Sequence, residues 1–139
     1  MGASYASTDF TYSGLTFGRS NAAIMSSSIQ IKAGTSNSVW NKTALSGPIT
    51  SIAITYKTNN STLTVGTSAK PSTNSQSVTA TNTYNYSASD NLTHFMIAAT
   101  GSYTQVTSVV VTYNTTNKAH SKYATTCCTP LGSINGSFS

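Results

Sequence analysis

The stretch ITSIAITYK at residues 49–57 decides the fold class, because its large apolar side chains recur at every second position. Ile52, Ile54 and Tyr56 fall on one face of an extended chain, while the residues between them fall on the opposite face. A strand with one apolar and one more polar face is typical of an antiparallel sheet that packs one side against a core. The stretch therefore predicts a β-strand in an all-β domain.

A second stretch, VTSVVVTY at residues 106–113, matches residues 49–56 position by position in character. One interpretation is a pair of pseudo-symmetric strands that lie side by side in one sheet. The other is that two core strands share the same β-favouring residues. One match of this length is too short to identify a repeat, so both interpretations stay open.

Similar runs recur along the whole chain and are separated by turn residues, which is the rhythm of a sandwich or barrel. No segment has a sustained apolar period of about 3.6 residues, so no α-helix is expected. We expect strands at residues 9–12, 15–17, 29–32, 39–43, 49–57, 62–65, 77–81, 83–87, 93–99 and 104–113.

The alternation within these strands also predicts which side chains enter the core. Phe95 and Ile97 share the predicted core face, with His94 on the polar face of the same strand. In the last strand, the same alternation groups Thr107 with Val109 on the core side.

The number and spacing of the strands predict an all-β fold, an antiparallel β-sandwich of jelly-roll type. The chain has 139 residues, which suits one domain. We assign residues 1–113 to the sandwich and 114–126 to a polar linker. Residues 127–139 are either the truncated start of a following module or a disordered tail. The first residues lack the features of a signal peptide. We therefore expect the export signal outside this fragment, and a secreted or cell-surface location.

The acidic residues argue against catalysis. Charged residues make up 6% of the chain, against about 25% in an average domain. Glycoside hydrolysis uses two positioned carboxylates, and the two acids present, Asp9 and Asp90, both lie beside turn signals. His94 and His120 have no recognisable nucleophile motif near them. We predict a binding domain and not an enzyme.

No cofactor is predicted either. A calcium site would depend mainly on backbone carbonyls, because carboxylates are so few, and no zinc-ligand spacing is present. Cys127 and Cys128 have three interpretations: a strained bond to each other, pairing with cysteines elsewhere, or free thiols. Adjacent Cα atoms are about 3.8 Å apart, less than the usual disulfide span, which disfavours the first.

The charge distribution limits the class of partner. The formal net charge is +5, from seven cations that are scattered along the chain. Nucleic-acid binders cluster their basic residues, so no nucleic-acid partner is expected. No apolar run is long enough to span a membrane. The cations are interpreted either as solubilising charges or as the sign of an anionic polymer partner, and we expect a monomeric module.

Aromatic rings beside amides and hydroxyls are the groups that bind sugars. The candidate site residues are Trp40 with Lys42, two positions along the same strand face, and Tyr84 with Asn85 and Tyr86. Trp40 and Lys42 would suit an anionic glycan, and the two tyrosines a second stacking surface. Asn85 would point to the opposite face of a regular strand. The alternative for each ring is packing in the core or at a sheet edge.

The middle of the chain, about Leu15 to Tyr113, resembles small jelly-roll domains in modular secreted and surface proteins of anaerobic gut bacteria. The resemblance is carried by IQIKAGT at residues 29–35 and by the two similar stretches quoted above. The CCT and GS motifs after residue 126 resemble the junctions between modules. The resemblance implies a carbohydrate-binding-module-like domain that holds a larger protein on a polysaccharide, by fold analogy alone. The alternative is a structural spacer or protein–protein interaction domain of a surface protein.

Overall fold

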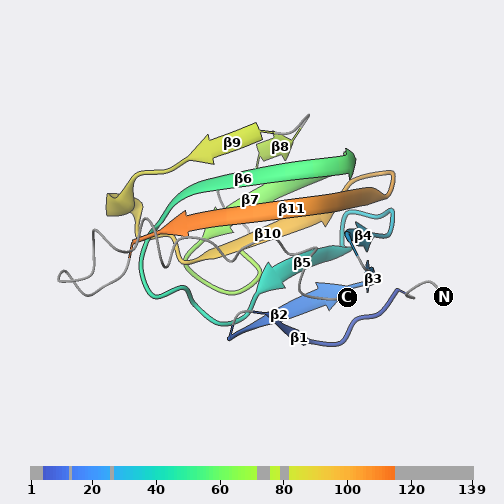
Figure 1. Cartoon of the computed structure of the whole chain (residues 1–139), viewed down its shortest axis with the longest axis horizontal. Helices are drawn as coiled ribbons and strands as arrows, with labels where there is room; N and C mark the ends of the chain where they lie inside the picture. The colour runs from blue at the N-terminus through green and yellow to red at the C-terminus, as the bar shows by residue number, and fades with distance from the viewer. Residues whose placement is uncertain (1–4, 13, 26, 72–75, 79–81, 115–139) are drawn as a thin grey trace.

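The computed structural model describes residues 5–12, 14–25, 27–71, 76–78 and 82–114. Within them the chain forms two antiparallel sheets that pack face to face (Figure 1). The six-stranded sheet has the order β1 (Phe10–Tyr12), β2 (Leu15–Ser20), β5 (Ser38–Asn41), β10 (His94–Ala99), β7 (Ser61–Gly66) and β8 (Gln76–Val78). The five-stranded sheet has the order β3 (Ala22–Ile24), β4 (Ile29–Ile31), β11 (Thr104–Tyr113), β6 (Ile49–Thr58) and β9 (Asn82–Asn85).

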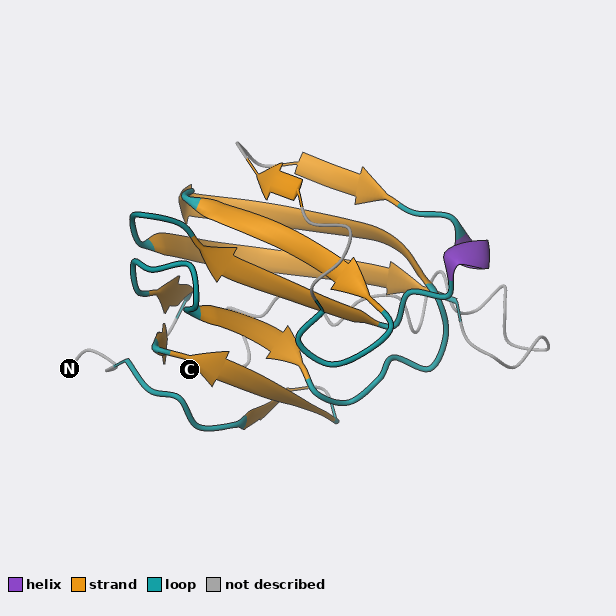
Figure 2. Ribbon diagram, turned by 180° about the vertical axis from the view of Figure 1, so that it is seen from behind, coloured by secondary structure: helices purple, strands orange, loops and turns teal. Residues whose placement is uncertain are grey.

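The predicted antiparallel β-sandwich is confirmed, and its jelly-roll type stays a prediction. From β4 to β11 the chain passes to the other sheet at each new strand, except at the β7–β8 pair. The view from behind shows the six-stranded sheet, with the one turn of 3₁₀ helix, Ala88–Asp90, after β9 (Figure 2). The predicted linker from residue 115 and the tail at 127–139, with both cysteines, lie outside the described residues.

The two similar stretches are neighbours in one sheet, as the first of the two interpretations predicts. β6 and β11 pair antiparallel, with Ile54 opposite Val109 and Ile52 opposite Val111. All four side chains are fully buried. The pair forms the middle of the five-stranded sheet, with β4 along one side and β9 along the other.

A β-bulge near the start of β11 changes which side chains of this strand face the core. The register shifts between Val106 and Ser108, so that Thr107 is the extra residue. Val106 is therefore buried, at 3% exposure. Thr107 points away from the core and donates its hydroxyl to the Thr55 carbonyl at 3.2 Å. Grouping Thr107 with Val109 was wrong, because the extra residue reverses the alternation.

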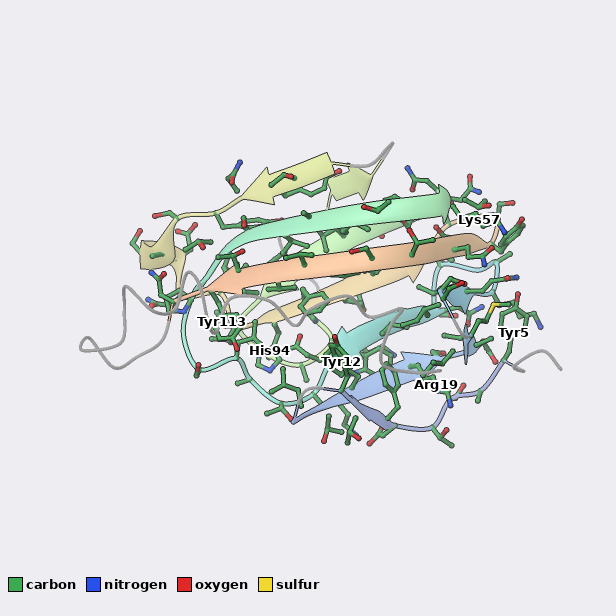
Figure 3. All side chains as sticks on the ribbon, in the orientation of Figure 1. Tyr5, Tyr12, Arg19, Lys57, His94 and Tyr113 are labelled. Atoms are coloured by element: carbon green, nitrogen blue, oxygen red, sulfur yellow. The ribbon has the colours of Figure 1, made fainter. Side chains whose placement is uncertain are left out.

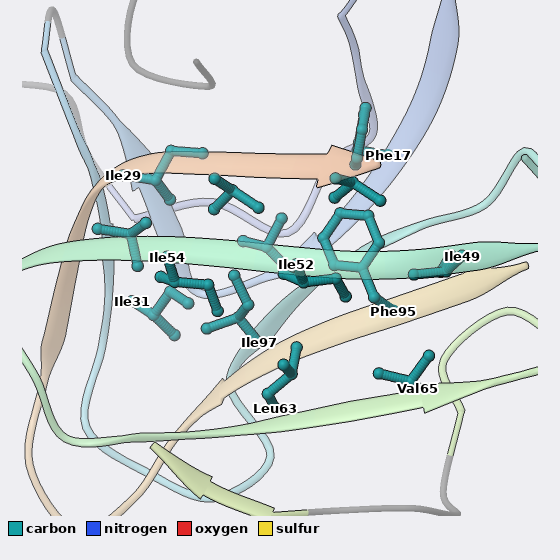
Figure 4. Close-up of a cluster of buried hydrophobic side chains, with 14 of the residues drawn as sticks. Phe17, Ile29, Ile31, Ile49, Ile52, Ile54, Leu63, Val65, Phe95 and Ile97 are labelled. Atoms are coloured by element: carbon teal, nitrogen blue, oxygen red, sulfur yellow. The ribbon is translucent and has the colours of Figure 1, made fainter. Parts of the chain in front are cut away.

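The core between the sheets is mainly aliphatic and includes two phenylalanine rings (Figure 4). Phe17 and Phe95 meet edge to face with ring centroids 6.4 Å apart. The predicted core positions of Phe95 and Ile97 are confirmed. Strand β3 was not expected from the sequence, because its residues, Ala-Ala-Ile, are all apolar and show no alternation.

Ser38 on β5 carries the one buried side-chain polar atom that lacks a hydrogen-bond partner in the described part of the chain. An unpaired buried hydroxyl destabilises a fold by about 1–3 kcal/mol. Ser38→Ala removes that hydroxyl, so we expect the free energy of unfolding to rise by about 1 kcal/mol. Urea denaturation measures this change.

The matched control is Ser61→Ala on β7, where the serine is equally buried but its hydroxyl is bonded. Ser61 is 3% exposed, and its Oγ lies 3.1 Å from the Tyr56 hydroxyl and 3.2 Å from Asn59 Oδ1. This substitution should lower the free energy of unfolding by about 1 kcal/mol. Equal losses in the two variants would contradict the prediction.

Candidate functional site

Trp40 lies on the outer face of the six-stranded sheet. Its neighbours along β5, Val39 and Asn41, are buried at 3% and 0% exposure, whereas Trp40 is half-buried and outside the core cluster. Alternation along the strand therefore directs the indole away from the space between the sheets. Its cross-strand partners are Gly18 on β2 and Met96 on β10.

Gly18 is what allows the indole to lie against the sheet. A Cβ at this position would be 2.5 Å from both Cε2 and Cζ2 of Trp40 and 2.8 Å from Nε1. The ring thus fills the space that a side chain would take on the neighbouring strand. A glycine inside a strand often marks such a close approach.

Asn41 fixes the end of the strand that presents Trp40. Its Nδ2 donates to the carbonyls of Thr43 at 2.8 Å and Thr93 at 3.0 Å. Its Oδ1 accepts from the Phe95 backbone N–H at 2.8 Å. The buried carboxamide thereby continues the contact between β5 and β10 beyond the last backbone pair, Trp40 with Met96.

Lys70, which was not among the predicted site residues, covers the indole. Its Nζ lies 4.6 Å from the centroid of the Trp40 ring, within the range of a cation–π interaction. Lys70 lies in the loop that follows β7. In the sequence, Lys70 and Pro71 showed only a turn signal, and nothing in the spacing connected them with Trp40.

Lys42, the cation expected beside Trp40, is engaged elsewhere. Its Nζ forms an ion pair with Asp9 at 2.8 Å, and the two side chains are 47% and 50% exposed. Its backbone N–H donates to the Thr16 carbonyl at 2.8 Å. Exposed ion pairs contribute little to stability, but this one provides the Lys42 ammonium with a counter-ion.

The second set of candidate residues, Tyr84 to Tyr86, lies in a different part of the molecule. Tyr84 lies on β9 at the edge of the five-stranded sheet, opposite Ile52 of β6. Tyr84 and Tyr86 are half-buried and pack against the core, and Asn85 between them is exposed. The structure therefore does not bring these three residues together with Trp40 and Lys42.

The side chains on the outer face around Trp40 are less exposed than the alternation of apolar and polar residues predicted. Thr64, His94 and Ala98 point outward but are only 3%, 6% and 5% exposed. His94, expected on a polar face, is thus buried. The sequence showed the direction of these side chains, but it did not show that a ring and a loop pack over the same face.

Burial also changes the acidity of His94. Desolvation lowers the pKa of its imidazole below the ordinary value, and a hydrogen bond to the Lys42 backbone acts more weakly in the opposite direction. Its Nδ1 lies 2.9 Å from the Thr93 hydroxyl. Among the described residues, no group of three or more His, Cys, Asp or Glu side chains could hold a metal ion. The helical turn described is far too short to cross a membrane.

Gly18→Ala should disturb the site directly, because the new Cβ would overlap the indole. We expect the free energy of unfolding to fall by about 1–3 kcal/mol, as for other overpacked positions. Trp40 is the only tryptophan in the chain, so its fluorescence emission should also shift. Gly101→Ala is the control, since a Cβ there meets nothing within 4 Å. Unchanged emission in Gly18→Ala would count against the close contact.

The lowered pKa of His94 predicts a pH dependence of stability. Unfolding restores the ordinary pKa of 6.5, so below that pH the unfolded chain binds a proton that the folded chain does not. The free energy of unfolding should therefore keep its highest value above pH 6.5 and fall as the pH drops toward the pKa of His94 in the folded state. Urea titrations at pH 8 and pH 5 measure the change, and His94→Gln should show a flatter profile. An equal pH dependence in this variant would assign the effect to other groups.

Comparison with known proteins gives no match: no protein-family model, no curated protein and no solved structure is significantly similar to this chain.

Proposed function

We propose that this domain is a non-catalytic module that binds a glycan on the outer face of its six-stranded sheet, centred on Trp40. The observation that carries the proposal is the position of the indole. It lies outside the core cluster, on the outer face, against the backbone of Gly18. A ring held in this way is preorganised, so little freedom is lost when a ligand stacks on it.

The chemistry around the indole supports a sugar more than a purely apolar ligand. Thr64 and Met96 continue the same row across the sheet from Trp40, and the Lys70 ammonium lies over the ring. A pyranose has an apolar C–H face that packs on an aromatic ring and hydroxyls that bond polar groups at its rim. One ring with an ammonium group over it suits both the apolar face and the polar rim of such a ligand.

The remaining expectations follow from this proposal. A module of this kind needs no catalytic carboxylates, which agrees with the two acids in the chain. It would act as a monomeric part of a larger secreted or cell-surface protein, holding that protein on a polysaccharide. Tyr84 on β9 and Tyr86 just after this strand contribute core packing, so the proposed site depends on a single stacking ring.

A structural spacer or protein–protein interaction domain is the second candidate, and the core packing of Tyr84 and Tyr86 favours it. The edge strands weigh against pairing between the sheet edges of neighbouring chains. β1, β3 and β8 have three residues each. Short edge strands offer few unpaired backbone groups to a neighbouring chain.

Trp40→Ala separates glycan binding from a structural role of the ring. We expect affinity for a bound glycan to fall by about 10- to 100-fold, by analogy with bases stacked on exposed rings. The loss of stability should stay below the 3–5 kcal/mol or so typical of a core aromatic ring, because the indole is half-buried. Affinity electrophoresis on a glycan panel and thermal melting measure the two effects.

Tyr103→Ala is the matched control, because Tyr103 is an exposed ring, at 42% exposure, in the loop before β11. This variant should keep both affinity and melting temperature. Unchanged mobility of the wild-type domain with every glycan would instead favour the spacer.

A further inference from the structure

The Lys70 ammonium on the Trp40 ring indicates which class of sugar the face would take. We propose that the site recognises an acidic sugar, whose carboxylate pairs with Lys70 while its C–H face stacks on the indole. This inference rests on the proposed glycan-binding function and narrows it to one ligand class.

Lys70 has no carboxylate partner of its own in the described chain. The whole sequence has two acids, Asp9 and Asp90. Asp9 is paired with Lys42 at 2.8 Å, and this is the only ion pair among the residues that the structure describes. The Lys70 ammonium instead contacts the face of the Trp40 ring, and its Nζ lies 4.6 Å from the ring centroid. Its charge therefore remains available to an anion from outside.

The geometry makes Lys70 selective for acids. The indole already packs against Gly18, so the side of the ring facing Lys70 is the one left for a ligand. A sugar stacked there has its carbons about 3.5–4.0 Å from the ring, in the space that the ammonium occupies. A neutral sugar would displace the ammonium and lose the cation–π contact. An acidic sugar would replace that contact with an ion pair at the rim of the ring.

The backbone at Lys70 supports a positioned side chain. Its φ is +56°, in the left-handed region, and the other described non-glycine residues with positive φ are Asn21 and Asn91. Asparagine tolerates this conformation, whereas lysine does not favour it. The following residue is Pro71, and a residue before proline prefers an extended backbone. Such unfavourable conformations persist only where the surroundings hold them, and they gather at ligand sites.

The test uses glycans in charged and neutral forms of the same backbone. The probes are polygalacturonate, hyaluronan and sialyllactose, each compared with its own methyl ester. Emission from Trp40 reports binding at the site, since the chain has no other tryptophan, and calorimetry gives the dissociation constants. In at least one pair, the acidic form should bind up to about fivefold more tightly, because both forms displace the cation–π contact but only the acidic form replaces it with an ion pair.

Two matched variants assign that preference to one lysine. Lys70→Gln keeps an extended polar side chain but removes its charge, so the ratio of acidic to neutral affinity should fall close to one. Lys42→Gln removes a charge only two residues from Trp40, and the ratio should not change. Both lysines are exposed, so both variants should keep the wild-type melting temperature.

The possible failures are distinguishable. Equal binding of the acidic and neutral forms would overturn the ligand class and leave glycan binding standing. Loss of the preference in Lys42→Gln but not in Lys70→Gln would overturn the assignment to Lys70. Binding of dextran sulfate by Trp40→Ala as tightly as by the wild type, together with loss of the acid preference in high salt, would reduce the effect to general charge attraction. No binding in any pair would overturn the proposed function itself.

Discussion

The pairing of β6 with β11 is the interaction on which the rest of the sandwich depends. Both strands have ten residues, and their inward side chains, including Ile52, Ile54, Val109 and Val111, are fully buried. Burying each such side chain stabilises the fold by about 1.5–3 kcal/mol. β4 and β9 extend this pair into a sheet, and the six-stranded sheet closes over it. The six-stranded sheet that carries Trp40 on its outer face packs its inner face on this pair.

A shortage of carboxylates shapes the electrostatics of the domain. Seven cations face two acids, so most cations have to be accommodated without an ion pair. In the described residues, Arg19 lies 5.8 Å from the Phe10 centroid and Lys32 lies 5.9 Å from that of Tyr5. Lys70 on Trp40 is the closest of the three such contacts. Aromatic faces thus take part of the role that Asp and Glu have in an average domain, and the positive charge is left uncompensated.

Alternation of apolar residues was enough to predict most strands and the core face of β6 and β10. It failed where a single residue changed the register, since the bulge at Thr107 leaves no mark in the sequence. It also identified Trp40 without finding Lys70, because contacts between a strand and a distant loop depend on tertiary packing. The burial of His94 was missed for the same reason. Asn41 looked like an ordinary polar strand residue, although its buried carboxamide makes three hydrogen bonds.

The placement of β11 has a mechanical consequence. Tyr5 and Tyr113 lie at opposite ends of the long axis of the sandwich (Figure 3), and β11 runs along that axis with partners on both sides (Figure 1). A tension applied between these two points would be directed along β11. The hydrogen bonds of an antiparallel pair lie perpendicular to the strands, so such a pull loads many of them at once in shear. β11 therefore resists extension more strongly than an edge strand such as β1, which has one neighbour and can be peeled off bond by bond.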